Sequence, residues 1–280
     1  MKFDPGLIVP DTDRRFGGLA RLYGKVGAEH IRAAHIVVVG LGGVGSWAAE
    51  AAARSGVARL TLIDFDHIAE SNINRQVHAI DSTMGQAKVQ AMRERIAHIN
   101  PECRVDCIEG FVDSENWPDI LSLDLHFDRR QFAVIDACDQ VKAKTAMAAW
   151  ALKNKMILIS VGAAGGKRLA HYVDIEDLSV VTHDPLLAQM RYRLRKEYGA
   201  ARLGKMNLVC VFSREPVAQP SLEKALSQQN NNIEGKLIKK AVALTRTDST
   251  LNCHGYGSVV SVTSTFGMCA TGWILNKIAG

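Results

Sequence analysis

The clearest pattern in the chain is a short apolar run that ends in closely spaced glycines. Residues 36–45 read IVVVGLGGVG, and the small-residue stretch SWAAEAAARSG follows directly. A continuous run of β-branched residues predicts a buried parallel strand, and the alanine-rich stretch predicts a helix. Gly40 permits the tight turn, Gly42 lets the backbone approach a ligand, and Gly45 lets the helix pack on the strand. The pattern predicts a strand–turn–helix unit that binds a nucleotide phosphate.

Two further apolar runs extend this unit into a sheet. Residues 59–63 read RLTLI and end at Asp64, about 20 residues after the last glycine, where a carboxylate can bond a ribose hydroxyl. Residues 132–135 read FAVI and run into Asp136 and Asp139. Open α/β sheets bind ligands at the carboxyl ends of their strands. We therefore predict an α/β fold: a Rossmann-like, doubly wound, mostly parallel sheet with a C-terminal extension.

The segment after Asp64 indicates which nucleotide binds. Residues 71–76 read SNINRQ, and Lys88 follows in GQAK. Arginine grips phosphate oxygens through its planar fork and lysine acts as a point charge, so this cluster suits a triphosphate better than the diphosphate of NAD. Asp139 would face those phosphates, and Mg²⁺ is usually held by one or two carboxylates plus substrate phosphates. The alternatives are a solvated loop for residues 71–76 and a helix N-cap for Asp139.

Composition limits the class of protein. The 280 residues are 47% hydrophobic, enough for one large α/β domain, and residues 1–5 carry an acid and a proline where a signal peptide would need an apolar run. The six cysteines include no Cys-x-x-Cys pair. This spacing argues against a four-cysteine zinc site and a disulfide framework, and favours a reducing, cytoplasmic location.

Three segments in the second half of the chain stand out by composition. Residues 255–275 are uncharged but rich in Gly, Ser and Thr, which favours a buried core or dimer-interface segment over a membrane span. Residues 191–205 are strongly basic, so they form either a solvated face or a strip of RNA phosphate contacts. Residues 215–250 are polar and are predicted to be a mobile insertion.

Several motifs in one order resemble a known superfamily. GLGGVG, LIDFD, SNINRQ, GQAKV, INPECRV and IDACD are similar to the adenylating domain of ubiquitin-activating enzymes and of the activators of molybdopterin synthase and thiamine biosynthesis. RRFGGLARLYG, NRQVHAI, VGAAGG and TSTFGM make the chain resemble one branch more closely, the tRNA threonylcarbamoyladenosine dehydratases. The resemblance covers about residues 14–213 and returns at about 253–275.

The resemblance assigns roles to individual residues. It implies that glycines of the turn cradle the ATP phosphates, that Asp64 holds the ribose, and that Asp139 binds Mg²⁺. Asn74, Arg75 and Lys88 would contact the triphosphate, with Arg75, Lys88 and Asp139 acting in catalysis. The turn glycines are Gly40, Gly42, Gly43 and Gly45.

The same resemblance implies a homodimer in which an N-terminal arginine reaches the partner's nucleotide. Arg15 matches the first arginine of an Arg-x-x-Arg pattern, and the second falls on Gly18, so Arg14 or Arg21 are alternatives for the contact. Residues 14–160 would then form the ATP-binding half of a single domain spanning 1–280. Residues 161–280 would form the substrate-facing half and the dimer contacts.

The implied function is ATP-dependent cyclisation of N6-threonylcarbamoyladenosine at position 37 of tRNA through an acyl adenylate. The implied partners are tRNA, a second copy of the chain and, as further candidates, sulfur-transfer accessory proteins; neither a ubiquitin-like carrier nor a membrane is expected. The nearest alternative is an adenylating activator of a ubiquitin-like sulfur carrier. An NAD-dependent dehydrogenase and a non-enzymatic adaptor are the others. Cys253 invites a thioester interpretation, but intramolecular ring closure needs no sulfur relay.

Overall fold

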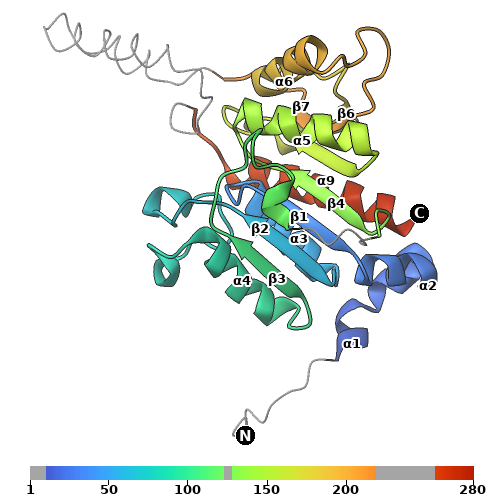
Figure 1. The fold of residues 1–280 in the computed structure, drawn as a ribbon. Coiled ribbons are helices and arrows are strands. Elements are labelled where there is room, and N and C mark those ends of the chain that lie inside the picture. The colour runs from blue at the N-terminus through green and yellow to red at the C-terminus, as the bar shows by residue number, and fades with distance from the viewer. Residues whose placement is uncertain (1–10, 123–127, 219–255) are drawn as a thin grey trace, which may run out of the picture.

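The computed structural model describes residues 11–122, 128–218 and 256–280 (Figure 1). Within these ranges one sheet of seven strands has the order β3-β2-β1-β4-β5-β7-β6. All neighbouring strands run parallel except β6 and β7, which pair antiparallel. The predicted doubly wound, mostly parallel α/β sheet is confirmed. The strands are β1 (His35–Val39), β2 (Arg59–Ile63), β3 (Arg104–Ile108), β4 (Phe132–Asp136), β5 (Ile157–Val161), β6 (Val173–Asp177) and β7 (Val209–Ser213).

Helices cover both faces of the sheet, which explains why the central strands read as unbroken apolar runs. In β1, Ile36 and Val38 face a core shared with α3, α4 and α9, whereas Val37 and Val39 face a core shared with α5 and α6. The α-helices are α1 (Thr12–Phe16), α2 (Gly18–Arg32), α3 (Gly45–Arg54), α4 (Lys88–Ile99), α5 (Val141–Asn154), α6 (Pro185–Glu197) and α9 (Val260–Ala279). Short 3₁₀ turns span Glu70–Asn72, Asp81–Thr83, Asp119–Leu121 and Ala170–Tyr172.

The uncharged C-terminal segment forms α9, which runs along one face of the sheet (Figure 1). Phe266, Ala270 and Ile274 are fully buried in the core. The hydroxyl of Thr271 donates to the carbonyl of Ala48 at 2.9 Å and ties α9 to α3. The segment was expected to be buried in the core or in a dimer interface rather than to span a membrane. Over Val260–Ala279 it forms a helix with one side buried in the core. In the described ranges, no helix has both the length and the apolar character needed to cross a membrane.

Helix α6 contains the first part of the basic segment. Leu187, Met190 and Leu194 are buried, as the spacing of apolar residues predicts. Arg191, however, donates from Nη1 to the carbonyls of Leu178 and Val181, both at 2.9 Å. A guanidinium held this way braces the helix against its neighbouring loop, so Arg191 is not a free phosphate contact.

The first residues of the expected insertion are anchored to the body of the domain. Glu215 accepts hydrogen bonds from the amides of Arg168 and Leu169 at 2.9 and 2.8 Å. The amide of Ala218 donates to the carbonyl of Gly166 at 2.8 Å. The rest of that expectation, and Cys253, lie outside the described residues.

Candidate active site

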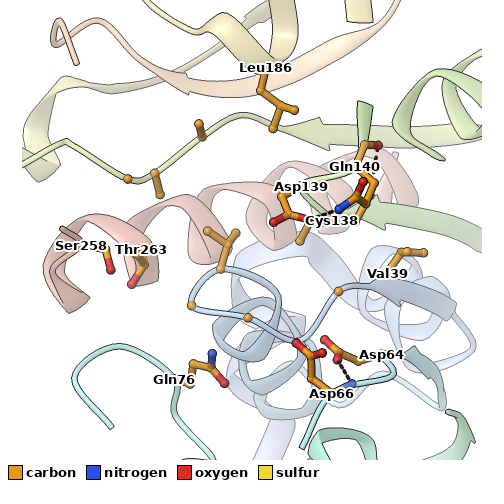
Figure 2. A pocket seen from close by; sticks show the side chains of 18 of the residues that line it. Val39, Asp64, Asp66, Gln76, Cys138, Asp139, Gln140, Leu186, Ser258 and Thr263 are labelled. Carbon is orange, nitrogen blue, oxygen red and sulfur yellow. Dashed lines mark hydrogen bonds between the residues drawn. The ribbon is translucent and has the colours of Figure 1, made fainter. Parts of the chain in front are cut away.

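One cavity of about 430 Å³ opens where the strands of the sheet end (Figure 2). Its lining includes the residues that directly follow four strands: Gly40 after β1, Asp64 after β2, Ala137 after β4 and Gly162 after β5. Gly110, two residues after β3, lines it as well. The strand order reverses between β1 and β4, and open α/β sheets bind ligands at such a switch point. The cavity is therefore at the place where this fold binds a nucleotide.

The glycine turn has the geometry that its spacing predicts. Gly40 has φ +86°, and a Cβ there would lie 2.9 Å from the carbonyl oxygen of Ala137. A Cβ on Gly45 would collide with the carbonyl of Gly40, so only glycine lets α3 begin this close to the turn. Nothing lies within 4 Å of a Cβ on Gly42. Gly40, Gly42 and Gly43 line the cavity, whereas Gly45 shapes the turn from behind.

Asp64 and Lys88 meet beside this turn. The carboxylate of Asp64 accepts from the amides of Leu41 at 2.6 Å and Asp66 at 2.8 Å. Burial raises the pKa of Asp64, while Lys88 and the two amides act against that rise. The ammonium of Lys88 lies 3.8 Å from Asp64 and 2.7 Å from Asp66. Lys88 therefore places a buried positive charge at the cavity wall next to an ordered carboxylate.

Arg75 lines the cavity, and Asn74 supports it. The Nη1 atom of Arg75 donates to the carbonyl of Ser71 at 2.7 Å and to the side chain of Asn74 at 2.8 Å. Asn74 donates in turn to the carbonyl of Ser258 at 3.1 Å, just before α9. Within the described chain, Nε of Arg75 and Oε1 of Gln76 are buried without a hydrogen-bond partner. Both residues line the cavity, whereas Asn74 is not among its lining residues.

Asp139 lies between the two sides of the cavity (Figure 2). The N-cap of α5 is Gln140, so the alternative role of Asp139 as a helix cap is not realised. Its carboxylate accepts one long hydrogen bond, 3.4 Å, from the side-chain amide of Gln140. A carboxylate with this environment is available to bind a cation.

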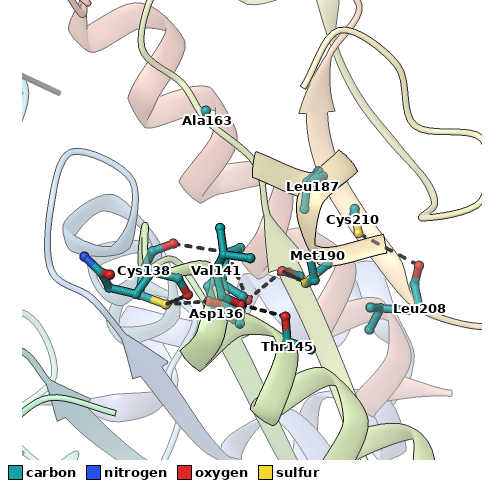
Figure 3. A network of polar contacts seen from close by, with 12 residues as sticks. Asp136, Cys138, Val141, Thr145, Ala163, Leu187, Met190, Leu208 and Cys210 are labelled. Carbon is teal, nitrogen blue, oxygen red and sulfur yellow. Dashed lines mark hydrogen bonds and ion pairs between the residues drawn. The ribbon is translucent and has the colours of Figure 1, made fainter. Parts of the chain in front are cut away.

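A buried network fixes the loop that carries Asp139 (Figure 3). Asp136 and Lys144 are fully buried and 2.9 Å apart, and Ser160 donates to Asp136 at 2.5 Å. Lys144 also donates to the carbonyl of Cys138 at 3.1 Å. Burial alone would lower the pKa of Lys144, but Asp136 outweighs it and the net pKa is raised. Asp136, which the sequence pairs with Asp139, therefore supports the loop rather than lining the cavity.

The cavity has two chemically different halves. One half, which we call the charged half, contains the acidic, basic and amide side chains. The other half, which we call the neutral half, is lined by small, apolar or aromatic residues. We define the charged half as Gly40, Gly42, Gly43, Asp64, Asp66, Asn72, Arg75, Gln76, Lys88, Gly110, Phe111, Ser258 and Thr263. We define the neutral half as Gly162, Ala163, Ala164, Gly165, Pro185, Leu186, Val217 and Tyr256.

Some lining residues were not singled out from the sequence. Gln76 is not one of them, because it belongs to the SNINRQ cluster expected near the phosphates, and it does line the cavity. Phe111 lines the cavity, and its ring centroid is 4.6 Å from that of Phe65, which no sequence pattern indicates. Leu186 and Tyr256 come from segments far apart in the chain, and only the fold brings them to one cavity.

Arg15 does not line the cavity of its own chain. It lies in α1, and its Nη1 donates to the carbonyl of Ile99 at 2.8 Å. The described cysteines, at positions 103, 107, 138, 210 and 269, are free thiols. Within the described ranges no three His, Cys, Asp or Glu side chains gather as a metal site.

Comparisons with known proteins agree with this geometry. A model described as the ThiF family matches residues 16–179. The chain is 38% identical over 276 residues to the tRNA threonylcarbamoyladenosine dehydratase of Escherichia coli (strain K12), covering 97% of this chain and 96% of the relative. A crystal structure of the E. coli tRNA N6-threonylcarbamoyladenosine dehydratase in complex with ATP superposes with a TM-score of 0.78 at 37% identity, covering 97% of each chain. Molybdopterin-synthase adenylyltransferase of Salmonella typhimurium is 35% identical over 138 residues, which is 49% of this chain and 52% of that one.

Proposed function

The chain belongs to the ThiF family, and we propose that it catalyses the ATP-dependent cyclisation of N6-threonylcarbamoyladenosine at position 37 of tRNA. One observation carries the proposal: a nucleotide cradle and a neutral half share one cavity, with Asp139 between them. Near-complete coverage of a dehydratase relative supports the same substrate. The sulfur-carrier activator, the nearest alternative, matches only about half of the chain.

The charged half fits ATP. The open backbone at Gly42 would receive the phosphates, and Asp64 would accept from the ribose. Arg75 and Lys88 would contact phosphate oxygens, since both residues line the cavity. Buried cations facing developing phosphate charge stabilise a transition state because they need no reorganisation.

Asp139 fits Mg²⁺. Asp139 lines the cavity, and its carboxylate accepts a long hydrogen bond from the neutral amide of Gln140. One or two carboxylates plus phosphates suffice for this ion, so the lack of a larger acidic cluster in the described ranges agrees with the assignment. When bound, Mg²⁺ would offset charge on the phosphates.

The reaction first activates the threonyl carboxylate, because a free carboxylate is a poor acyl donor. The threonyl carboxylate attacks the α-phosphorus of ATP, which forms an acyl–O–P bond and releases pyrophosphate. A ureido nitrogen of the same modification then attacks the carbonyl, loses its proton and displaces AMP, closing a five-membered ring. The two reacting groups belong to one nucleoside, and well-placed intramolecular attack reaches effective molarities of about 10⁵–10⁸ M. For that reason, no covalent relay through Cys253 is needed.

We also propose a homodimer in which Arg15 reaches the partner's nucleotide. Arg15 does not line the cavity of its own chain, and its guanidinium would have to leave the carbonyl of Ile99 to make that contact. Arg14 and Arg21 remain alternatives for that contact. A cytoplasmic location follows from a tRNA substrate. Sulfur-transfer accessory proteins remain candidate partners, and the division into halves at residue 160 remains a proposal.

The test is direct. The protein is incubated with ATP and threonylcarbamoylated tRNA, and the digested nucleosides are analysed by mass. We expect a modified nucleoside that is lighter by one water, together with AMP and pyrophosphate. Pyrophosphate exchange stimulated by a ubiquitin-like carrier but not by tRNA would instead support the activator. Tight binding of NAD rather than ATP would support the dehydrogenase, and no AMP with any substrate would support the adaptor.

A further inference from the structure

The neutral half of the cavity carries no charged side chain among its described lining residues. Its lining consists of residues 162–165, which are glycine and alanine, of the apolar residues Pro185, Leu186 and Val217, and of one aromatic residue, Tyr256. An unpaired phosphate or carboxylate would find no counter-charge there, so this half suits a neutral, flat group.

The two walls are held at a fixed separation. The carboxylate of Asp184 accepts from the amide of Ala163 at 2.8 Å and from the amide of Leu187 at 2.9 Å. It thus joins the glycine-rich loop to the first turn of α6, where it is also the N-cap. A Cβ on Gly162 would collide with this carboxylate, so the close approach requires glycine.

Tyr256 closes the glycine-rich side. A Cβ on Gly165 would lie 3.4 Å from Cβ of Tyr256, and one on Gly166 would lie 3.3 Å from Cδ1 of its ring. The amide of Gly166 donates to the carbonyl of Gly257 at 2.8 Å and fixes the backbone next to Tyr256. The tyrosine is therefore set against glycine backbone, and it presents its side chain to the cavity from a constrained position.

We propose that the neutral half binds the purine base of the modified nucleoside and that Tyr256 is the residue that recognises it. The inference rests on the proposed function and deepens it by locating the substrate. Proteins that recognise unpaired RNA bases stack them on aromatic side chains. A base held between Tyr256 and Leu186 would leave its N6 substituent free to extend toward Asp139 and the α-phosphate at the boundary of the two halves.

The test compares steady-state kinetics of Tyr256→Ala, Tyr256→Phe and wild type on a threonylcarbamoylated anticodon stem-loop. Alanine substitution of a stacking aromatic costs about 5- to 100-fold in affinity, so KM for the RNA should rise by that factor in Tyr256→Ala. Tyr256→Phe keeps a stacking ring and should stay close to wild type. The affinity for ATP, measured without RNA, should be unchanged in both. Tyr198→Ala is a matched control because Tyr198 is exposed and does not line the cavity.

A second variant keeps the test independent of any packing role of Tyr256. Ala163→Leu adds bulk to the glycine-rich loop that lines the same half, two residues from the Gly165 position against which Tyr256 packs, and should raise KM for the RNA while ATP affinity stays at the wild-type value. The inference is overturned if Tyr256→Ala and Ala163→Leu leave KM for the RNA unchanged, or if they weaken ATP binding as much as RNA binding. These outcomes need an active wild type. A wild type that forms no cyclic nucleoside would defeat the proposed function instead.

Discussion

The charged and neutral halves of the cavity lie at the same edge of one sheet, yet they are constructed in opposite ways. In the charged half, the side chains of Lys88, Arg75 and Asp64 line the cavity, and the backbone at Gly42 is open. In the neutral half, small and apolar residues line the cavity, and the carboxylate of Asp184 is bonded to the backbone amides of Ala163 and Leu187 rather than facing the cavity. The comparison indicates that one half can recognise a ligand by charge, whereas the other can recognise it only by shape and apolar contact.

The largest expected effect is a loss of stability when the buried ion pair beneath the Asp139 loop, between the two halves, is broken. Lys144→Met should lower the free energy of unfolding by about 3–5 kcal/mol, because removing one member of a buried ion pair leaves Asp136 charged and buried. Urea titration of the variant measures the loss. Lys142→Met, an exposed lysine on the same helix, is the control and should stay near wild type.

A double variant decides whether the loss comes from charge. Adding Asp136→Asn to Lys144→Met removes the uncompensated carboxylate and should restore part of the stability. If the double variant is no more stable than Lys144→Met, packing of the lysine stem rather than the ion pair holds the Asp139 loop.

Substitutions at Arg75 and Asp139 should lower the catalytic rate strongly while leaving the stability of the fold nearly unchanged. Arg75→Ala and Asp139→Ala should each lower AMP formation by about 10²–10³-fold, the usual cost of losing one charge-stabilising group. Neither residue is in the buried core, so thermal unfolding should change little. Arg93→Ala on α4 is a control of equal charge on an exposed site. Turnover close to wild type in either variant would remove that residue from the active site.

The two halves also differ in how far the sequence could predict them. The charged half follows from local patterns: the turn and Asp64 directly follow strands, and Arg75 and Lys88 stand in short motifs further along the chain. Asp139, between the halves, stands in a motif after β4. Local spacing could not assign Asn74, because only the path of the SNINRQ loop decides which amide faces the cavity. It turns Asn74 back toward Ser258.

The neutral half depends on contacts that no local pattern contains. Leu186 follows a helix cap, and Tyr256 belongs to a segment that reaches the cavity only after the sheet is assembled. The basic segment, residues 191–205, is a second case in which contacts made by the fold could not be predicted from the local sequence. Charge density suggested that Arg191 is free, but the fold places two carbonyl acceptors beside it.

The stability of the protein should also depend on pH, because a buried histidine, His78, lies near Lys88 of the charged half. Burial, with help from Lys88 and Arg95, lowers the pKa of His78 from 6.5 to about 4. Between pH 6.5 and about pH 4, His78 is protonated in the unfolded chain but neutral in the folded protein. The free energy of unfolding therefore falls as the pH falls through this window. Asp64, whose pKa burial raises, acts in the opposite sense.

The difference between wild type and His78→Gln isolates this contribution. The free energy of unfolding of wild type should drop by about 1–2 kcal/mol more than that of His78→Gln between pH 7.5 and pH 5, as measured by urea titration. His98→Gln, an exposed histidine on α4, is the control. Equal drops in wild type and His78→Gln would show that His78 takes up its proton in the folded state.

The smallest effect is expected outside both halves, on the basic surface after α6. Lys196, near the end of α6, and Arg202 and Lys205, which follow it, are exposed. Unlike Arg191, these three side chains make no hydrogen bond to the described part of the chain. If they contact tRNA phosphates, replacing all three by Gln should flatten the log–log dependence of tRNA binding on salt by about 0.7–0.9 units per lost contact. ATP affinity should not change, because none of the three lines the cavity.

The control for this surface is a triple variant of equal charge on the neighbouring helix α5. Lys142, Lys153 and Lys155 are exposed residues on or directly after α5, and replacing them by Gln should leave the slope at the wild-type value. Counterion release depends on the number of phosphates neutralised, so a specific contact strip and a general positive charge predict different results. Equal flattening in both triple variants would assign the effect to net charge. An unaltered slope in the Lys196, Arg202 and Lys205 variant would mean that this face is solvated in the complex, and tRNA would then be held mainly at the cavity.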